Sequence, residues 1–232
     1  MKGRLFGVSV GPGDPELMTL KAVRAIREAD VLAVPNIGHK RQTAFDIADE
    51  YLQDKRVLDC PTPMTGDRET ARKAYAKIAD DVCALLDEGK TVAYLCLGDI
   101  AIYSTYGYVH DIVAARGYEA EIIPGVTSFS ACAAKLGMTL CEGSQSLLVA
   151  PAMATDIDAA LNVPATKVFM KSGKAVGSLR DKLAERGQLH HASMVTNCGL
   201  PDEKVLPRLS DVDIDAGTDY FSVVIVKAPR ES

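Results

Sequence analysis

Three short glycine-containing segments carry the residues of this sequence whose types suit ligand binding. They are Gly11-Pro12-Gly13-Asp14-Pro15, Gly98-Asp99 and Pro124-Gly125-Val126-Thr127-Ser128, and each follows an apolar run that is typical of a β-strand. Glycine lets the backbone turn tightly and approach a ligand closely. The carboxylate of Asp99 is suited to binding an amine or ribose hydroxyls, and the third segment offers two hydroxyl groups. Ligand binding by backbone turns is therefore the first hypothesis.

Each segment also has a simpler interpretation as ordinary turn chemistry. Asp14 is well placed as the N-cap of a following helix, with Pro15 at its first position. Thr127 or Ser128 could likewise cap the helix that runs through Cys132. Taken one at a time, the segments indicate only an α/β protein with a crevice.

The first half of the chain predicts strands and helices in strict alternation, which is typical of βαβ units and a parallel sheet. In such a sheet, the turns after the strands line one crevice at their carboxyl ends. The expected strands are Leu5 to Val10, Val31 to Val34, Val57-Leu58, Thr91 to Leu97 and Glu121 to Ile123. The expected helices carry Leu17, Leu20, Val23 and Ile26 on one face, then cover Phe45 to Leu52, Arg68 to Glu88, and Tyr106 to Ala115.

The second half is less regular and indicates a second α/β domain. One helix is expected over Val176 to Glu185, and the stretch from Pro201 to Asp219 suggests loops and edge strands. Strands are expected at Ser146 to Val149, Lys167 to Met170, Met194 to Thr196 and Ser222 to Val226. We place the boundary between residues 1–122 and residues 123–232.

Composition excludes several classes of function. The 232 residues carry a net charge of −5, which argues against a nucleic-acid partner. No apolar run approaches the roughly 18 residues of a membrane span. The apolar run at the N-terminus is short and lacks a cleavage site, so a first core strand is expected there rather than a signal peptide.

Cysteine and histidine spacing predicts neither disulfides nor a bound metal. The six cysteines form no CxxC pair, and Cys83, Cys96 and Cys132 lie among apolar residues, as buried free thiols do. A reducing cytoplasm is therefore expected. No two of the four histidines have the i, i+4 spacing of a helical metal site.

Two common nucleotide sites are also unlike this sequence. Gly7, Gly11 and Gly13 do not have the G-x-G-x-x-G spacing of a dinucleotide site, and the second strand ends in Pro35-Asn36 with no acid for a ribose. No Gly-Lys-Ser/Thr follows any predicted strand, so a P-loop is absent.

Read together, the segments resemble the tetrapyrrole methylase family. The run from Gly7 to Ala22 closely resembles the opening signature of that family, and Ile26 to Val31 continues the resemblance. Leu97 to Ser104 resembles its mid-chain Gly-Asp-Pro loop, with Ile100 in place of the usual proline. Ile123 to Ser128 resembles its Pro-Gly-Val/Ile-Thr-Ser/Ala turn. Order and separation agree along essentially the whole chain.

Two shorter motifs resemble one branch of the family, which methylates C-20 of precorrin-2 or cobalt-factor II in cobalamin biosynthesis. These motifs are Thr62-Pro63-Met64-Thr65 and Met170-Lys171-Ser172-Gly173. The alternatives are another corrinoid carbon, a protein side chain as in diphthine synthases, or a non-catalytic module that binds S-adenosylmethionine or a tetrapyrrole.

The resemblance implies a fold of two α/β domains with a cleft between them, an N-terminal parallel sheet and a C-terminal mixed sheet. It also implies a homodimer. S-adenosylmethionine is expected in the cleft, with the tetrapyrrole in a trough of the N-terminal domain. By position, the cofactor contacts would be Pro12, Leu97, Gly98, Asp99, Ile102, Thr127, Ser128, Met170 and Gly199.

The resemblance leaves the substrate contacts and the proton acceptor open. Asp99 and Tyr103 are candidate proton acceptors, although holding the cofactor is the favoured role for Asp99. Candidate substrate-binding residues are Gly11, Gly13, Asp14, Lys171 and Lys174. Further cations that could meet substrate carboxylates are Lys40, Arg41, Arg68 and Arg72, each of which is otherwise an ordinary solvated charge. No protein-bound metal is expected, because methyl transfer needs none.

Overall fold

A computed structural model describes residues 2–37, 40–41, 43–52, 54–63, 65–213 and 218–228. The chain divides into two compact units, Met1–Thr127 and Ser128–Ser232, and both are α/β. The expected boundary at 122/123 falls inside the last strand of the first unit. Among the described residues, no helix combines the length and apolar character that crossing a membrane requires.

The first unit is built on a sheet with the strand order β3-β2-β5-β1-β6, and β4 pairs with β2. Every pairing is parallel except the short one between β2 and β3, which is antiparallel and differs from the all-parallel sheet expected. The strands are β1 (Arg4–Ser9), β2 (Val31–Ile37), β3 (Lys40–Arg41), β4 (Arg56–Pro61), β5 (Val92–Cys96) and β6 (Glu119–Ile123). The five predicted strands are therefore confirmed.

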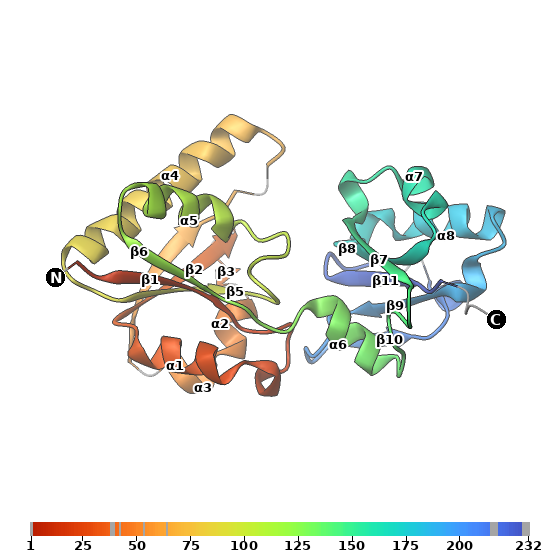
Figure 1. Ribbon diagram of the computed structural model, residues 1–232, viewed down its shortest axis with the longest axis horizontal. Helices are drawn as coiled ribbons and strands as arrows, with labels where there is room; N and C mark the ends of the chain where they lie inside the picture. The colour runs from red at the N-terminus through yellow and green to blue at the C-terminus, as the bar shows by residue number, and fades with distance from the viewer. Residues whose placement is uncertain are drawn as a thin grey trace. The chain divides into compact units, whose positions relative to one another are not determined.

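Helices cover both faces of this sheet (Figure 1), as a buried parallel sheet requires. On one face lie α1 (Leu20–Glu28), α2 (Thr43–Ile47) and α3 (Asp49–Leu52), and on the other lie α4 (Arg68–Asp87) and α5 (Tyr106–Ala115). The expected helix over residues 45–52 is wrong as a single element, because it is two short helices that meet at Ala48.

The first helix also differs from its prediction. A short 3-10 helix, Pro15–Leu17, is capped by Asp14, and α1 begins separately after Thr19, whose hydroxyl accepts a hydrogen bond from the Ala22 amide at 3.1 Å. Leu20 was expected on the buried face but is 88% exposed. The interruption between the two helices shifts the helical phase, so that Ala22, Ala25 and Ile26 are the buried residues of α1.

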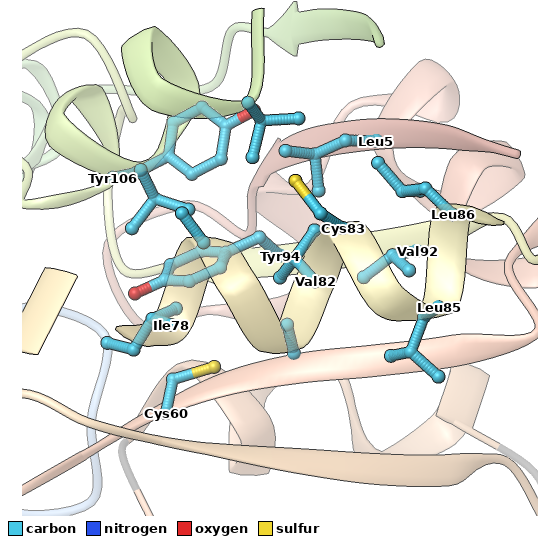
Figure 2. Close-up of a cluster of buried hydrophobic side chains, with 14 of the residues drawn as sticks. Leu5, Cys60, Ile78, Val82, Cys83, Leu85, Leu86, Val92, Tyr94 and Tyr106 are labelled. Carbon is cyan, nitrogen blue, oxygen red and sulfur yellow. The ribbon is translucent and has the colours of Figure 1, made fainter. Parts of the chain in front are cut away.

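The core between the sheet and α4/α5 explains the predicted pattern of the long helix. Figure 2 shows Ile78, Val82 and Leu85 of α4 packed against strand residues. Tyr106 of α5 fits there because Gly7 faces it, and a Cβ on Gly7 would lie 2.3 Å from the Tyr106 ring. Burying each such aliphatic side chain stabilises the fold by about 1.5–3 kcal/mol.

The second unit contains the mixed sheet β10-β9-β11-β8-β7, as expected. The neighbouring strands β7 and β8 pair in parallel, whereas β11 pairs antiparallel with both β8 and β9, and β10 pairs antiparallel with β9. The strands are β7 (Ser146–Pro151), β8 (Ala165–Met170), β9 (Ala192–Thr196), β10 (Lys204–Leu206) and β11 (Ser222–Val226). The edge strand β10 lies in the stretch predicted to hold loops and edge strands.

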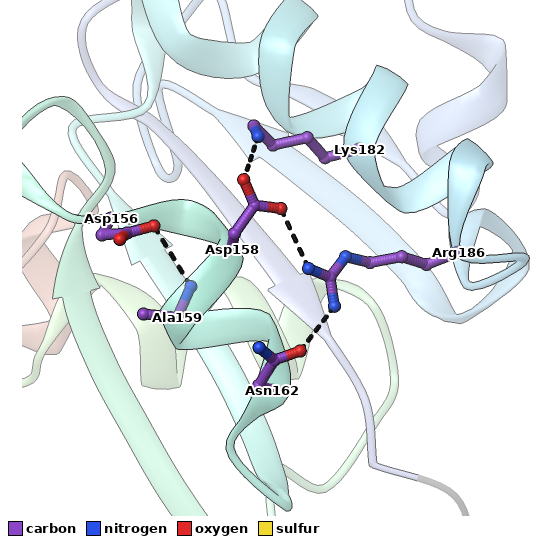
Figure 3. Close-up of polar contacts among 6 residues, drawn as sticks. All are labelled: Asp156, Asp158, Ala159, Asn162, Lys182 and Arg186. Atoms are coloured by element: carbon purple, nitrogen blue, oxygen red, sulfur yellow. Dashed lines mark hydrogen bonds and ion pairs between the residues drawn. The ribbon is translucent and has the colours of Figure 1, made fainter.

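The helices of the second unit are α6 (Ser128–Lys135), α7 (Ile157–Asn162) and α8 (Val176–Glu185). Short 3-10 helices lie at Ala152–Ala154, Gly173–Ala175, Leu189–His191 and Leu209–Asp211. Helices α7 and α8 are joined by a polar network (Figure 3), in which the Asp158 carboxylate accepts hydrogen bonds from Lys182 and from Arg186, the latter at 2.9 Å. Both hydrogen bonds lower the pKa of the Asp158 carboxyl, and the bond from Lys182 is the larger cause.

Candidate functional site

The turns that follow β1 and β5 are hydrogen-bonded to each other. The Gly98 amide donates to the Gly11 carbonyl at 2.7 Å, and the Gly11 amide donates to the Gly98 carbonyl at 3.3 Å. Both residues have a left-handed backbone, with φ of +78° at Gly11 and +73° at Gly98. An L side chain is strained in that conformation, which explains why glycine stands at both positions.

Asp99 ties the second turn to the third. One carboxylate oxygen accepts a hydrogen bond from the Ala101 amide at 2.9 Å, and the other accepts from the Gly125 amide at 2.8 Å. Each oxygen is therefore already bound to a backbone N–H of the first unit. The Asp99 carboxylate therefore links the second turn to the third.

Ser9 joins the same cluster and was not singled out from the sequence. Its side chain is fully buried, and its hydroxyl oxygen accepts a hydrogen bond from the Ile100 amide at 2.9 Å. A Cβ on Gly125 would lie only 2.5 Å from the Ser9 Cβ, so the third turn passes directly against β1. The available signal was a polar residue inside an otherwise apolar strand.

The rest of the first turn is held by its own backbone. Pro12 and Gly13 are buried, and the half-buried Asp14 accepts a hydrogen bond from the Glu16 amide at 2.9 Å. The N-cap prediction for Asp14 is therefore confirmed for the short helix that follows. Its assignment to substrate binding stays a prediction.

The mid-chain loop presents the remaining candidates of the first unit. Leu97 and Ile102 are half-buried, whereas Tyr103 is 43% exposed and has a φ of +52°. Cys96, at the end of β5, does not suit nucleophilic chemistry, because burial raises the pKa of its thiol to about 12. Like Cys83 and Cys132, it is a buried free thiol, as expected.

The remaining cofactor candidates belong to the second unit. Ser128 is the first residue of α6, and Met170 is the half-buried last residue of β8. The half-buried Gly199 has a φ of +78°, and its amide donates a hydrogen bond to Glu203 at 2.6 Å. This bond is the main reason why the pKa of Glu203 is lowered, and a salt bridge to Lys135 adds to it.

Residues 171–173 are held against the segment before β11. The Ser172 amide donates to the Ser222 carbonyl at 3.0 Å, and the Thr218 hydroxyl donates to the Gly173 carbonyl at 2.5 Å. Lys171 has a φ of +54°, and its ammonium nitrogen lies 5.8 Å from the centre of the Tyr220 ring. A clamped backbone therefore carries this candidate cation.

The other candidate cations are less well defined. Lys174 is exposed in a short 3-10 helix, and Arg68 and Arg72 are exposed in the first turns of α4. The backbones of Lys40 and Arg41 form β3, but their side chains lie outside the described part of the structure, as does Met64 of the branch motif.

The structure thus brings together the three predicted turns of the first unit through the backbone of Gly11, Gly98 and Gly125. Thr127 ends this unit, and Ser128 begins the next. Sequence reasoning missed Ser9, whose hydroxyl accepts the Ile100 N–H of the mid-chain turn, and Glu203, whose carboxylate accepts the Gly199 N–H in the second unit. Within the described ranges, no three His, Cys, Asp or Glu side chains gather as the ligands of one metal ion would.

The fold is that of a two-unit α/β protein in which three turns at the carboxyl ends of parallel strands are hydrogen-bonded to one another. Residues 4–213 match the family of Tetrapyrrole (Corrin/Porphyrin) Methylases. The chain belongs to this family, and the family resemblance seen in its motifs is confirmed.

Individual relatives agree with that membership. The chain is 34% identical to the cobalamin biosynthesis protein CobIJ of Mycobacterium tuberculosis over 99% of its own length, but it spans only 47% of that relative. It is 33% identical to the cobalt-precorrin-2 C(20)-methyltransferase of Salmonella typhimurium, over 100% of the chain and 99% of the relative. It is also 33% identical to the precorrin-2 C(20)-methyltransferase of a Sinorhizobium species, over 97% of the chain and 95% of the relative.

A solved structure supports the fold. The cobalt precorrin-4 methyltransferase CbiF superposes with a TM-score of 0.76, covering 97% of this chain and 94% of that one, at 20% sequence identity. The expected fold of two α/β units, each built on its own sheet, is confirmed.

Proposed function

We propose that this chain transfers a methyl group from S-adenosylmethionine to C-20 of precorrin-2 or cobalt-factor II in cobalamin biosynthesis. The observation that carries the proposal is the similarity to C-20 methyltransferases, which covers the whole chain and so includes all three tied turns. Both metal-free and cobalt-containing substrates occur among the names of the relatives, so the proposal covers both.

The space beside Gly98 in the first unit supports a cofactor site at the tied turns. A Cβ added to Gly98 would meet nothing within 4 Å, so the backbone of this turn is open to a close neighbour. Around it we assign Pro12, Leu97, Asp99, Ile102 and Thr127 to the cofactor. From the second unit we assign Ser128, Met170 and Gly199, and the first unit would also supply the substrate trough.

Methyl transfer from this donor mainly requires that the donor and the acceptor be held in the right geometry. When bound, S-adenosylmethionine supplies a methyl group that is already activated as a sulfonium, and its leaving group is a neutral thioether. Holding two reactants in the right geometry can supply about 7–11 kcal/mol of barrier reduction. Asp99, Ser9 and the two bridged glycines give the turns that rigidity, because each contact fixes a backbone atom rather than a mobile side chain.

A proton must leave C-20 after the transfer. Both oxygens of Asp99 already accept backbone N–H groups, which favours a positioning role for this residue over a role as base. Tyr103, 43% exposed on the same loop, is the remaining candidate acceptor. The substrate carries several carboxylates, so Lys171 and Lys174 are proposed to bind them by charge-assisted hydrogen bonds. We further propose a cytoplasmic homodimer.

The test is anaerobic incubation of the purified protein with precorrin-2 or cobalt-factor II and S-adenosylmethionine carrying a ¹³C-methyl group. NMR of the product identifies the carbon that gains the label, and competition between the two substrates shows which is preferred. Label at C-20 supports the proposal. Label at another carbon, or on a protein, would assign the chain to a different branch. Tight cofactor binding without turnover on any early tetrapyrrole would indicate a binding module.

A further inference from the structure

The buried hydroxyl of Ser9 lies beneath the mid-chain turn and contacts its backbone. Its oxygen accepts the Ile100 N–H at 2.9 Å, and the side chain has no exposed surface. We propose that Ser9 is a positioning residue that fixes the Gly98–Ile102 turn in the geometry that binds S-adenosylmethionine. This inference rests on the proposed function, since cofactor binding is its main readout.

The identity of residue 100 explains why the turn needs this hydroxyl. The Ile102 amide donates to the Asp99 carbonyl at 3.2 Å, so Ile100 is the second residue of a β-turn. Proline suits that position because its φ is preset and it has no N–H to satisfy. Isoleucine brings an N–H, and the Ile100 side chain is itself buried, with 4% of its surface exposed. A buried N–H without an acceptor is costly, and Ser9 supplies the acceptor.

The hydrogen bond between Ile100 and Ser9 matters for the proposed cofactor site because it links the mid-chain turn to a strand. The other ties of this turn join it to neighbouring turns, namely Gly98 to Gly11 and Asp99 to Gly125. The Ser9 hydroxyl ties it to β1, a strand that is hydrogen-bonded on both sides within the sheet. Removing the hydroxyl leaves the other ties and the core intact, so the protein should fold while the turn loses its anchor.

The decisive variants are Ser9→Ala and the double variant Ser9→Ala/Ile100→Pro. Ser9→Ala should raise the KM for S-adenosylmethionine about 5- to 10-fold, the consequence of one unpaired buried N–H. At saturating cofactor, kcat should stay within about twofold, because the turn adopts its binding geometry once the cofactor is present. Adding Ile100→Pro should restore the KM, since proline removes the unpaired N–H and presets the turn.

Two controls separate positioning from general destabilisation. Val113→Ala trims a fully buried side chain of α5 in the same core and should lower the melting temperature without changing the KM. Ile100→Val keeps the N–H and should not rescue Ser9→Ala. Amide hydrogen exchange adds a readout that needs no turnover: the Ile100 amide should exchange about tenfold faster in Ser9→Ala than in Val113→Ala.

An unchanged KM and unchanged Ile100 exchange in Ser9→Ala would overturn the inference. So would a raised KM that Ile100→Pro fails to lower in a double variant that folds. If the double variant does not fold, the inference stands only if Ser9→Ala shows both a raised KM and faster exchange at the Ile100 amide. Failure of the unaltered protein to bind S-adenosylmethionine in calorimetry would instead refute the proposed function.

Discussion

Replacing Asp99 with alanine should loosen the second and third turns together. The substitution leaves the amides of Ala101 and Gly125 without their acceptor, and these bonds measure 2.9 and 2.8 Å. Hydrogen bonds to a charged group contribute about 1.5–3 kcal/mol each. The bond from Ala101 is exposed, so water replaces much of it, and the bond from Gly125 is partly buried. The free energy of unfolding should therefore fall by about 2–3 kcal/mol in total.

Denaturant unfolding measures that loss, and titration calorimetry measures the affinity for S-adenosylmethionine. The affinity should drop at least about tenfold, because part of the binding energy must then order the two turns. Asp99→Asn should lie between alanine and the natural residue. Its amide keeps one acceptor oxygen, but its NH₂ group faces the second backbone N–H and cannot accept from it.

Asp67→Ala is the matched control for Asp99→Ala. Asp67 also accepts two backbone amides, from Glu69 at 3.1 Å and Thr70 at 3.2 Å, but it does so at the exposed start of α4. Losing this cap should cost about 1 kcal/mol of stability and leave cofactor affinity unchanged. The reasoning is refuted if Asp99→Ala binds S-adenosylmethionine as tightly as the natural protein. Unchanged affinity with lost turnover would instead make Asp99 a catalytic group.

Three further substitutions test open space, steric clash and charge in turn. Gly98→Ala should cost only about 1–2 kcal/mol of stability, the strain of a left-handed alanine, yet weaken cofactor affinity sharply, because its methyl group enters open space above the turn. Gly125→Ala should do more damage to the melting temperature, since its Cβ would lie 2.5 Å from the Ser9 Cβ; equal melting temperatures would contradict this. Glu203→Gln should destabilise the protein at pH 7, because a carboxyl whose pKa is lowered on folding stabilises the native state above its unfolded value, near 4.5. That difference should shrink as the pH falls below 4.5 through the folded pKa and vanish in acid; urea unfolding of both proteins at several pH values checks it, and a difference that is constant with pH would refute it.

The amino-acid sequence by itself determined the elements and the family. Helix α5, helix α8 and strand β11 have the bounds expected from apolar spacing, because burial against a sheet imposes a period of 3.6 on helices and a continuous apolar run on central strands. The three glycine turns were also evident, since left-handed backbone and tight turns require glycine locally.

Only the tertiary structure decided how those turns are held. The hydrogen bonds from Ile100 to Ser9 and from Gly125 to Asp99 join residues that are 91 and 26 positions apart. No local pattern encodes such a pairing, because it depends on which strands become neighbours in the sheet. The exposure of Leu20 was also not evident from the sequence, because the apolar spacing continues from Leu17 to Leu20 although the helix is interrupted between them. Short-range propensity specifies which residues turn, whereas the strand order β5-β1-β6 specifies which turns meet.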